Sequence, residues 1–139
     1  MSAFLWALVT AGIWGVVPLM EKIGLASNAP TAGVMVRSLG IVIGFLVFSW
    51  VWSPWHAVRG MTWSSIALLA SGGFLASFVG QMAFYQALKS GAISQVTPVA
   101  GAYPLVAALL GWWVLREPLT ATRLFGVLCV VVGVWLLRR

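Results

Sequence analysis

Five long apolar segments follow one another along this chain, and they constrain its fold more than any other feature. A helix needs about 20 predominantly apolar residues to cross the roughly 30 Å of hydrocarbon in a bilayer. Polar or proline-containing breaks separate segments of this kind, at about residues 3–20, 31–52, 63–88, 92–115 and 120–137. The sequence therefore predicts an all-α integral membrane protein with about five transmembrane helices, in a single domain over residues 1–139.

The composition excludes a water-soluble domain and argues against nucleic-acid binding. Hydrophobic residues make up 62% of the chain and charged residues 7%, so a water-facing surface cannot be built from it. Eight basic residues stand against two acidic ones, Glu21 and Glu117, but the basic residues are scattered between apolar runs. We expect a multi-pass protein of the cell membrane whose partner is the lipid bilayer and not nucleic acid.

The sequence offers no set of residues typical of catalysis or metal binding. Its one histidine, His56, lies in a polar break, and its one cysteine, Cys129, lies inside an apolar run. Neither has a second residue with which to form a catalytic pair or a metal site. We therefore expect no enzyme activity, no metal and no cofactor.

Basic residues are nearly balanced between the two faces of the predicted bundle. Five spans place Arg59, Arg116 and Arg123 on the N-terminal side, and Lys22, Lys89, Arg138 and Arg139 on the other side. Membrane proteins orient so that the face with more basic residues lies on the cytoplasmic side. In this chain the difference between the two faces is small. The sequence slightly favours a cytoplasmic C-terminal side and allows insertion in both orientations.

Polar residues inside the spans are the first candidates for function, because placing them in hydrocarbon is costly. Arg37 lies about two turns into the second segment, at a depth similar to that of Glu21 at the end of the first. Either these two side chains form an ion pair, or Arg37 extends to the lipid headgroups. Gln81 and Tyr85, four residues apart on one helix face, either line a cavity or tie helices together.

Two prolines interrupt the fourth segment, in the pairs Thr97-Pro98 and Tyr103-Pro104. Each proline removes a backbone hydrogen bond and bends the helix. Transporters place such broken helices at binding sites and hinges, although proline kinks also serve packing alone. We predict that this segment, rather than the charged residues, carries a solute path, and that Trp14 adds an aromatic wall.

Gly126 and Gly133 lie seven residues apart in the last segment. Small residues at such spacing allow a second helix to approach closely. Packing within one protomer and contact between the two protomers of a dimer are both consistent with this spacing.

Motifs spread over essentially the whole chain form a combination typical of one family. They are Trp14-Gly15, Lys22, Arg37, AFYQALKSG (83–91), VTPVAGAYPLVAALLG (96–111), REPL (116–119) and GVLCVVVGVWLL (126–137). Together they resemble the EamA domain of the drug/metabolite transporter superfamily.

The resemblance implies that the chain is one EamA-type repeat. Typical members of the superfamily have ten spans in two five-helix repeats of opposite orientation, and they export small metabolites by alternating access. Two copies of this chain would rebuild that architecture as an antiparallel homodimer. The small multidrug resistance proteins, a related group, carry a proton-coupling glutamate in their first helix. Thr10 and Trp14 occupy the centre of that segment here, which argues against proton-coupled cation export.

The predicted function is that of a transporter subunit that moves a small metabolite or drug-like solute by alternating access as a dimer. Its expected substrate-binding residues are Trp14, Arg37, Gln81, Tyr85, Thr97, Pro98, Tyr103 and Pro104. Two alternatives stay open: a flippase for a lipid-linked substrate, and a non-transporting accessory subunit of another membrane protein.

Overall fold

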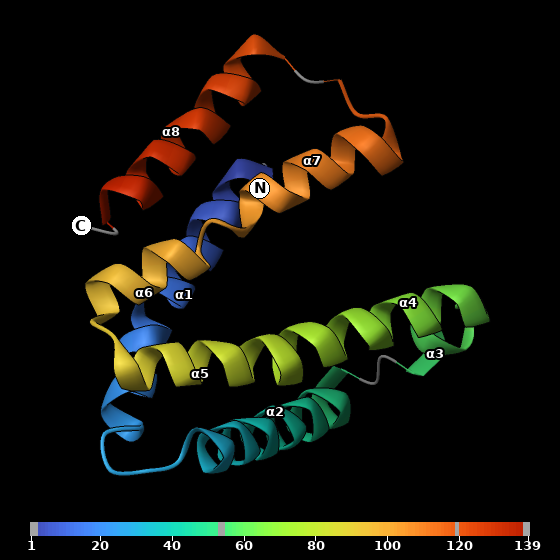
Figure 1. Ribbon diagram of the computed structural model, residues 1–139. Helices are drawn as coiled ribbons and strands as arrows, with labels where there is room; N and C mark the ends of the chain where they lie inside the picture. The colour runs from blue at the N-terminus through green and yellow to red at the C-terminus, as the bar shows by residue number, and fades with distance from the viewer. Residues whose placement is uncertain (1–2, 53–54, 119, 138–139) are drawn as a thin grey trace. The chain divides into compact units, whose positions relative to one another are not determined.

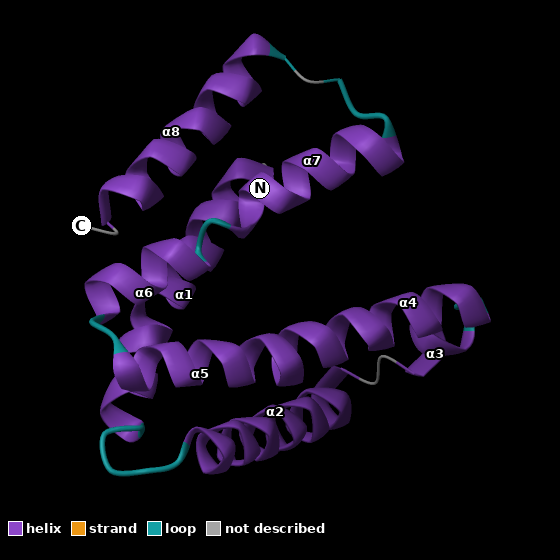
Figure 2. Cartoon of the chain, viewed as in Figure 1, coloured by secondary structure: helices purple, strands orange, loops and turns teal. Residues whose placement is uncertain are grey.

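The computed structural model describes residues 3–52, 55–118 and 120–137, and these residues form helices joined by short loops (Figures 1 and 2). Within them there is no strand, so the predicted all-α fold class is confirmed. The chain divides into two compact units, Met1–Lys89 and Ser90–Arg139. Three residues named above, Leu119, Arg138 and Arg139, lie outside the described ranges.

The first unit contains three apolar helical runs that are long enough to cross a bilayer. They are α1 (Ala3–Gly24), α2 (Pro30–Trp52) and a run made of α4 (Trp63–Phe74), the π-helical segment η1 (Leu75–Gly80) and α5 (Gln81–Ser90). A short helix, α3 (Trp55–Arg59), precedes α4 where the sequence predicted only a break.

The loop between α1 and α2 is shorter than predicted, because both helices extend into it. α1 continues about one turn past its predicted end near Met20. The side-chain amide of Asn28 then donates to the carbonyl of Gly24 at 2.8 Å. This bond satisfies one of the carbonyls that a helix end leaves free. α2 begins at Pro30 itself, since the missing N–H of a proline costs nothing in the first turn.

The third run begins at a side-chain cap and is interrupted by a π-helix. Thr62 precedes α4, and its hydroxyl oxygen accepts a hydrogen bond from the amide of Ser65 at 3.3 Å. The π-helical turns of η1 replace the continuous α-helix that the apolar pattern predicted, and Gln81 follows them directly. Because a π-helix is wider than an α-helix, η1 changes the direction in which the side chains of α5 point.

The second unit consists of a broken run, α6 (Ile93–Ala100) and α7 (Tyr103–Leu115), followed by α8 (Ala121–Leu137). The predicted fourth helix is interrupted at residues 101–102 rather than only bent. Pro104 has no N–H to donate to the carbonyl of Ala100, and α6 closes with a bond from the amide of Gly101 to the carbonyl of Thr97 at 2.8 Å. The run from Ile93 to Leu115 is still long enough to span a bilayer, and α8 is a shorter apolar helix.

Few apolar side chains are buried inside the described residues. Leu25, Val34, Tyr85 and Leu88 form this small core, whereas large apolar side chains along all the spans are exposed. A surface of this kind is stable when it faces lipid tails or another transmembrane helix. The core residues come from the turn that follows α1, the start of α2 and the second half of α5, so the first unit is held together there.

α7 ends at a residue with unfavourable backbone geometry. Arg116 is the only non-glycine residue in the described ranges with a positive φ, which is 54°. This conformation lets the amide of Glu117 donate to the carbonyl of Gly111 at 3.1 Å, and so closes the helix end.

Replacing Arg116 with glycine should therefore stabilise the protein by about 1 kcal/mol, because glycine adopts this φ without a clash of its Cβ atom. Thermal unfolding in detergent would measure the effect. Arg116→Ala is the control, since it also removes the guanidinium but keeps the Cβ atom. Only the glycine variant should show a raised Tm; equal values for the two variants would contradict backbone strain at this position.

Candidate functional site around Glu21

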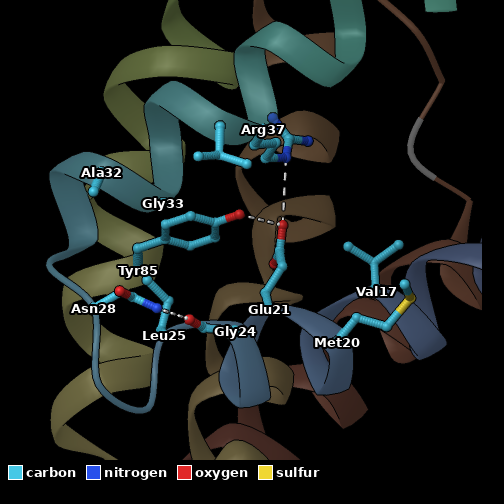
Figure 3. Close-up of a pocket in the computed structure, with 11 residues that line it drawn as sticks. Val17, Met20, Glu21, Gly24, Leu25, Asn28, Ala32, Gly33, Arg37 and Tyr85 are labelled. Atoms are coloured by element: carbon cyan, nitrogen blue, oxygen red, sulfur yellow. Dashed lines mark hydrogen bonds and ion pairs between the residues drawn. The ribbon is translucent and has the colours of Figure 1, made fainter.

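Glu21, in the last turn of α1, lies at the centre of a cluster of polar side chains (Figure 3). Its Oε1 atom accepts hydrogen bonds from Gln81 Nε2 and from the Tyr85 hydroxyl, both at 2.9 Å. The same atom lies 3.3 Å from Nε of Arg37. The Glu21 side chain is 10% exposed and that of Arg37 is 32% exposed. One carboxylate oxygen thus collects three donors in a largely buried position.

The three donors reach Glu21 from two other helices. Arg37 lies two turns into α2, while Gln81 and Tyr85 lie one turn apart on α5 and share a helix face. The two interpretations of Gln81 and Tyr85, cavity lining and helix tying, are therefore not exclusive. Both residues tie α5 to α1 through Glu21, and Tyr85 also lines the neighbouring pocket.

A glycine allows the Tyr85 ring to pack closely against α2. A Cβ atom added at Gly33 would lie 2.9 Å from Cε2 and 3.0 Å from Cδ2 of Tyr85, and 2.7 Å from Cδ2 of Leu25. Carbon atoms do not approach this closely without repulsion. The absence of a side chain at position 33 therefore positions the Tyr85 hydroxyl for its hydrogen bond to Glu21.

Two lysines tie the ends of the same helices together. The ammonium group of Lys22 donates to the carbonyl of Leu88, and that of Lys89 donates to the carbonyl of Asn28. The Leu88 carbonyl lies near the C-terminus of α5, where carbonyls carry partial negative charge, so the Lys22 ammonium is favourable there. These contacts hold α1 and α5 beside the loop that leads into α2.

A pocket of about 510 Å³ adjoins the cluster. It is lined by Val17, Met20, Glu21, Gly24, Leu25, Asn28, Ala32, Gly33, Val36, Arg37 and Tyr85 (Figure 3). Most of these side chains are apolar, and the polar wall consists mainly of Glu21, Arg37 and Tyr85. Its volume lies in the range of small-molecule sites, about 300–1,000 Å³.

Two polar atoms of the cluster are buried without a partner among the described residues. They are Oε2 of Glu21 and Nη1 of Arg37. A buried polar atom with no hydrogen bond costs about 1–3 kcal/mol, and more when the group is charged. Each of these two atoms therefore has room in its hydrogen bonding for a partner that the described side chains do not supply.

The other residues predicted for the substrate site lie elsewhere in the two units. Trp14 is 58% exposed on α1 and does not line the pocket. Thr97, Pro98, Tyr103 and Pro104 belong to the second unit, on either side of the break between α6 and α7. Thr97 Oγ1 is buried there without a described partner. Of the eight predicted residues, the structure brings together Arg37, Gln81 and Tyr85.

Glu117, the second acidic residue of the chain, has a different environment. Its Oε2 atom lies 3.9 Å from Nη1 of Arg123, and both side chains are more than half exposed. Exposed ion pairs contribute about 0–1 kcal/mol. Glu117 therefore serves as a matched control for experiments on Glu21.

Comparison with known protein families identifies the chain. Residues 1–139 match the EamA-like transporter family. The chain belongs to this family. No curated protein and no solved structure gave a match.

Family membership and the apolar helices together establish the class of protein. This EamA-like chain is a multi-pass membrane protein of the drug/metabolite transporter type. Members of the family are in general transporters rather than enzymes. Within the described residues, no group of three or more histidine, cysteine or acidic residues could hold a metal ion.

Sequence reasoning identified the charged pair but missed several neighbours that shape the site. Gly33 and Asn28 were not proposed as site residues, and Glu21 was considered only as a partner of Arg37. One signal was available for Glu21: it is the only carboxylate among the three runs of the first unit. A charged residue among apolar spans is costly unless it is paired, so hydrogen-bond donors are expected around it.

Gly33→Ala should disturb the site, because the new Cβ atom displaces the Tyr85 ring and weakens its hydrogen bond to Glu21. We expect destabilisation of about 1–3 kcal/mol, typical of overpacking. The control is Gly40→Ala in the same helix, where an added Cβ atom meets nothing within 4 Å and alanine favours the helix. Unfolding in detergent would measure both variants, and equal stability would contradict the close packing at Gly33.

The Glu21–Arg37 contact predicts coupling between mutations. Arg37→Ala should cost about 1–3 kcal/mol, because Glu21 loses a charged donor in a largely buried position. Unfolding free energies for Arg37→Ala, Glu21→Ala and the double variant give the interaction energy directly. Purely additive effects would mean that Arg37 is stabilised by the headgroups and not by Glu21.

Proposed function

We propose that this EamA-like chain moves a small solute across the cell membrane by alternating access, as an antiparallel homodimer. The observation that carries the proposal is the charged cluster around Glu21, which borders an open pocket within apolar spans. Charged groups are retained in such a position when they take part in function or bind one another. Here the residues of the cluster satisfy only part of one another's hydrogen-bonding groups, because Oε2 of Glu21 and Nη1 of Arg37 lack partners among the described residues.

The location of this pocket changes one expectation about the solute path. The fourth helix was predicted to carry it in place of the charged residues, but the pocket in the first unit is lined by Glu21 and Arg37. We therefore assign solute contact to the Glu21 cluster. The break between α6 and α7 acts as a hinge in this proposal, since its backbone hydrogen bonding is already interrupted.

Two features support a dimer of opposed copies. The family resemblance implies one repeat where typical members have two inverted repeats, and the nearly equal numbers of basic residues on the two faces allow both orientations. Gly126 and Gly133 on α8 offer a contact, because an added Cβ atom would meet nothing within 4 Å at either position. A partner helix could therefore approach the α8 backbone closely.

Orientation can be tested with a single reporter cysteine. Ser27 is exposed in the loop between α1 and α2, so Ser27→Cys in a Cys129→Ser background places the only thiol there. A membrane-impermeant maleimide should label about half of the protein from each side, as insertion in both orientations requires. Complete labelling from one side would contradict the antiparallel dimer.

Transport can be tested in proteoliposomes by counterflow with a panel of labelled solutes. The panel contains L-leucine, 3-methylbutylamine, 4-methylpentanoate and glucose, which differ in charge. At least one of them should be exchanged by the wild type and by Glu117→Gln, and not by Glu21→Gln. Exchange that is equal in all three proteins would remove the Glu21 cluster from the solute path, and exchange of no panel member would contradict the proposed transport.

Lysines added to the N-terminus should force one orientation of the chain and abolish exchange. Exchange should return when a second copy that is biased in the opposite way is expressed with it. Undiminished exchange by the singly oriented protein would contradict the requirement for opposed copies.

A further inference from the structure

A second pocket lies in the first unit, where α1 and α5 both end. It has a volume of about 370 Å³ and is lined by Lys22, Leu25, Ala26 and Lys89. The Glu21 pocket shares only the Leu25 side chain with it. We propose that this Lys22–Lys89 pocket binds a phosphate group, at the depth in the bilayer where anionic lipid headgroups lie.

Two ammonium groups reach the pocket from different helices. Lys22, in the last turn of α1, donates to the carbonyl of Leu88 on α5. Lys89, in the last turn of α5, donates to the carbonyl of Asn28 in the loop after α1. The two bonds cross between the same helix ends and bring two positive charges to one place. Because like charges repel, an anion that attracts both of them is favoured there.

The protein compensates these two charges only in part. A backbone carbonyl carries a partial negative charge, whereas each ammonium carries a full positive charge and has three donors. Glu21 is the only acidic side chain among residues 1–89, and its Oε1 atom lies with Arg37 and Tyr85. The described residues that line the Lys22–Lys89 pocket include two lysines and no acidic side chain.

The position of the lysines along the spans indicates which anion they meet. The first and third membrane-spanning runs end at Gly24 and Ser90, so each lysine lies within two residues of the end of its run. Lipid phosphates supply the negative charge at this level of a bilayer, and basic pockets between transmembrane helices bind anionic headgroups. Lysine binds phosphate as a compact point charge and needs no planar arrangement of donors.

The remaining walls limit the size of the ligand. Leu25 is 3% exposed and belongs to the apolar core, so it forms a fixed wall, and Ala26 adds only a methyl group. The volume is near the lower limit of small-molecule sites, which suits a phosphate together with the glycerol carbons joined to it. A phosphate held there contacts both α1 and α5, and should therefore stabilise the first unit.

Two sources could supply the phosphate. One is an anionic lipid such as phosphatidylglycerol, whose acyl chains would lie along the exposed apolar surface of the helices. The other is a free phosphate ester from the water phase. The two sources share the group that the lysines contact and differ in their acyl chains.

The first experiment measures lipid binding to the wild type in a neutral maltoside detergent, by native mass spectrometry. The probes are phosphatidylglycerol and phosphatidylcholine with identical acyl chains. Both contain a phosphate, but the trimethylammonium group of phosphatidylcholine cancels its charge. Phosphatidylglycerol should bind about tenfold more tightly, because a basic residue near anionic lipid contributes about a fivefold factor and two are present. Equal affinities, or no binding of phosphatidylglycerol, would overturn the proposal.

Variants then assign the preference to the two lysines. Lys22→Gln and Lys89→Gln should each weaken phosphatidylglycerol about fivefold and leave phosphatidylcholine unchanged. Lys89→Arg should bind like the wild type, because it keeps the charge at an exposed position. Arg59→Gln is the matched control, since Arg59 is an exposed basic residue of α3 that does not line this pocket. An equal loss in Arg59→Gln, or no loss in either lysine variant, would contradict a site at the lysines.

The rise in Tm caused by the lipid gives a second measurement that allows for any loss of stability in the variants. Glutamine keeps an N–H donor for the carbonyl that each lysine contacts, and a ligand raises the Tm only of a protein that binds it. Phosphatidylglycerol should raise the Tm of the wild type, Arg59→Gln and Lys89→Arg by similar amounts, and that of Lys89→Gln by less. An equal rise in Lys89→Gln would contradict the proposal, even if Lys22→Gln does not fold.

Competition with sn-glycerol 3-phosphate distinguishes the two sources, because this probe carries the phosphate without acyl chains. Displacement of phosphatidylglycerol by the probe in the wild type would show that a free phosphate ester suffices. Lysine-dependent lipid binding that the probe does not displace would identify the membrane lipid as the occupant. Both results support a phosphate site, whereas lipid binding that neither responds to the probe nor depends on the lysines would overturn it.

Discussion

A carboxylate placed among apolar helices is stable only when donors compensate its charge, and Glu21 fixes the arrangement of the first unit in this way. Its Oε1 atom gathers Arg37 from α2 and Gln81 and Tyr85 from α5. The buried apolar core beside it is small, so these polar contacts carry much of the specificity of packing. Lys22 and Lys89 add a second set of contacts at the same helix ends.

The exposed apolar surface has a direct consequence for function. In water, hydrophobic burial would hold the helices together, but lipid tails are as apolar as leucine and provide little of that driving force. Close packing at Gly33 and hydrogen bonds to Glu21 therefore specify which helices meet. A solute that competes for the same hydrogen-bonding groups can shift the helices, and this is the kind of coupling that alternating access requires.

Much of this organisation could be predicted from the sequence, because membrane thickness and helix periodicity leave few choices. The spans, the similar depth of Glu21 and Arg37, and the shared face of Gln81 and Tyr85 all follow from spacing. The close approach at Gly33 could not be predicted, since it depends on which helices are neighbours. The π-helix at 75–80 was also missed, because its residues are apolar like those of an ordinary span.

The broken fourth run shows the same limit. The positions of Pro98 and Pro104 predicted a disturbance of the helix, but not that it would stop at Ala100 and restart at Tyr103. Whether a proline kinks or interrupts a helix depends on which hydrogen bonds the neighbouring backbone amides can form. Here the amide of Gly101 bonds to Thr97 and that of Ala102 to Val99, which closes the first helix.

Infrared difference spectroscopy on solute binding tests the central role of Glu21 most directly. The chain has only two acidic side chains, Glu21 and Glu117, so its side-chain carboxylate bands can be assigned with two variants. When the exchanged solute carries a carboxylate, a ¹³C label in that group moves the band of the solute away from those of the protein. We expect a carboxylate difference band on binding that is retained in Glu117→Gln and absent in Glu21→Gln. A band that persists in Glu21→Gln would show that the solute binds away from this carboxylate.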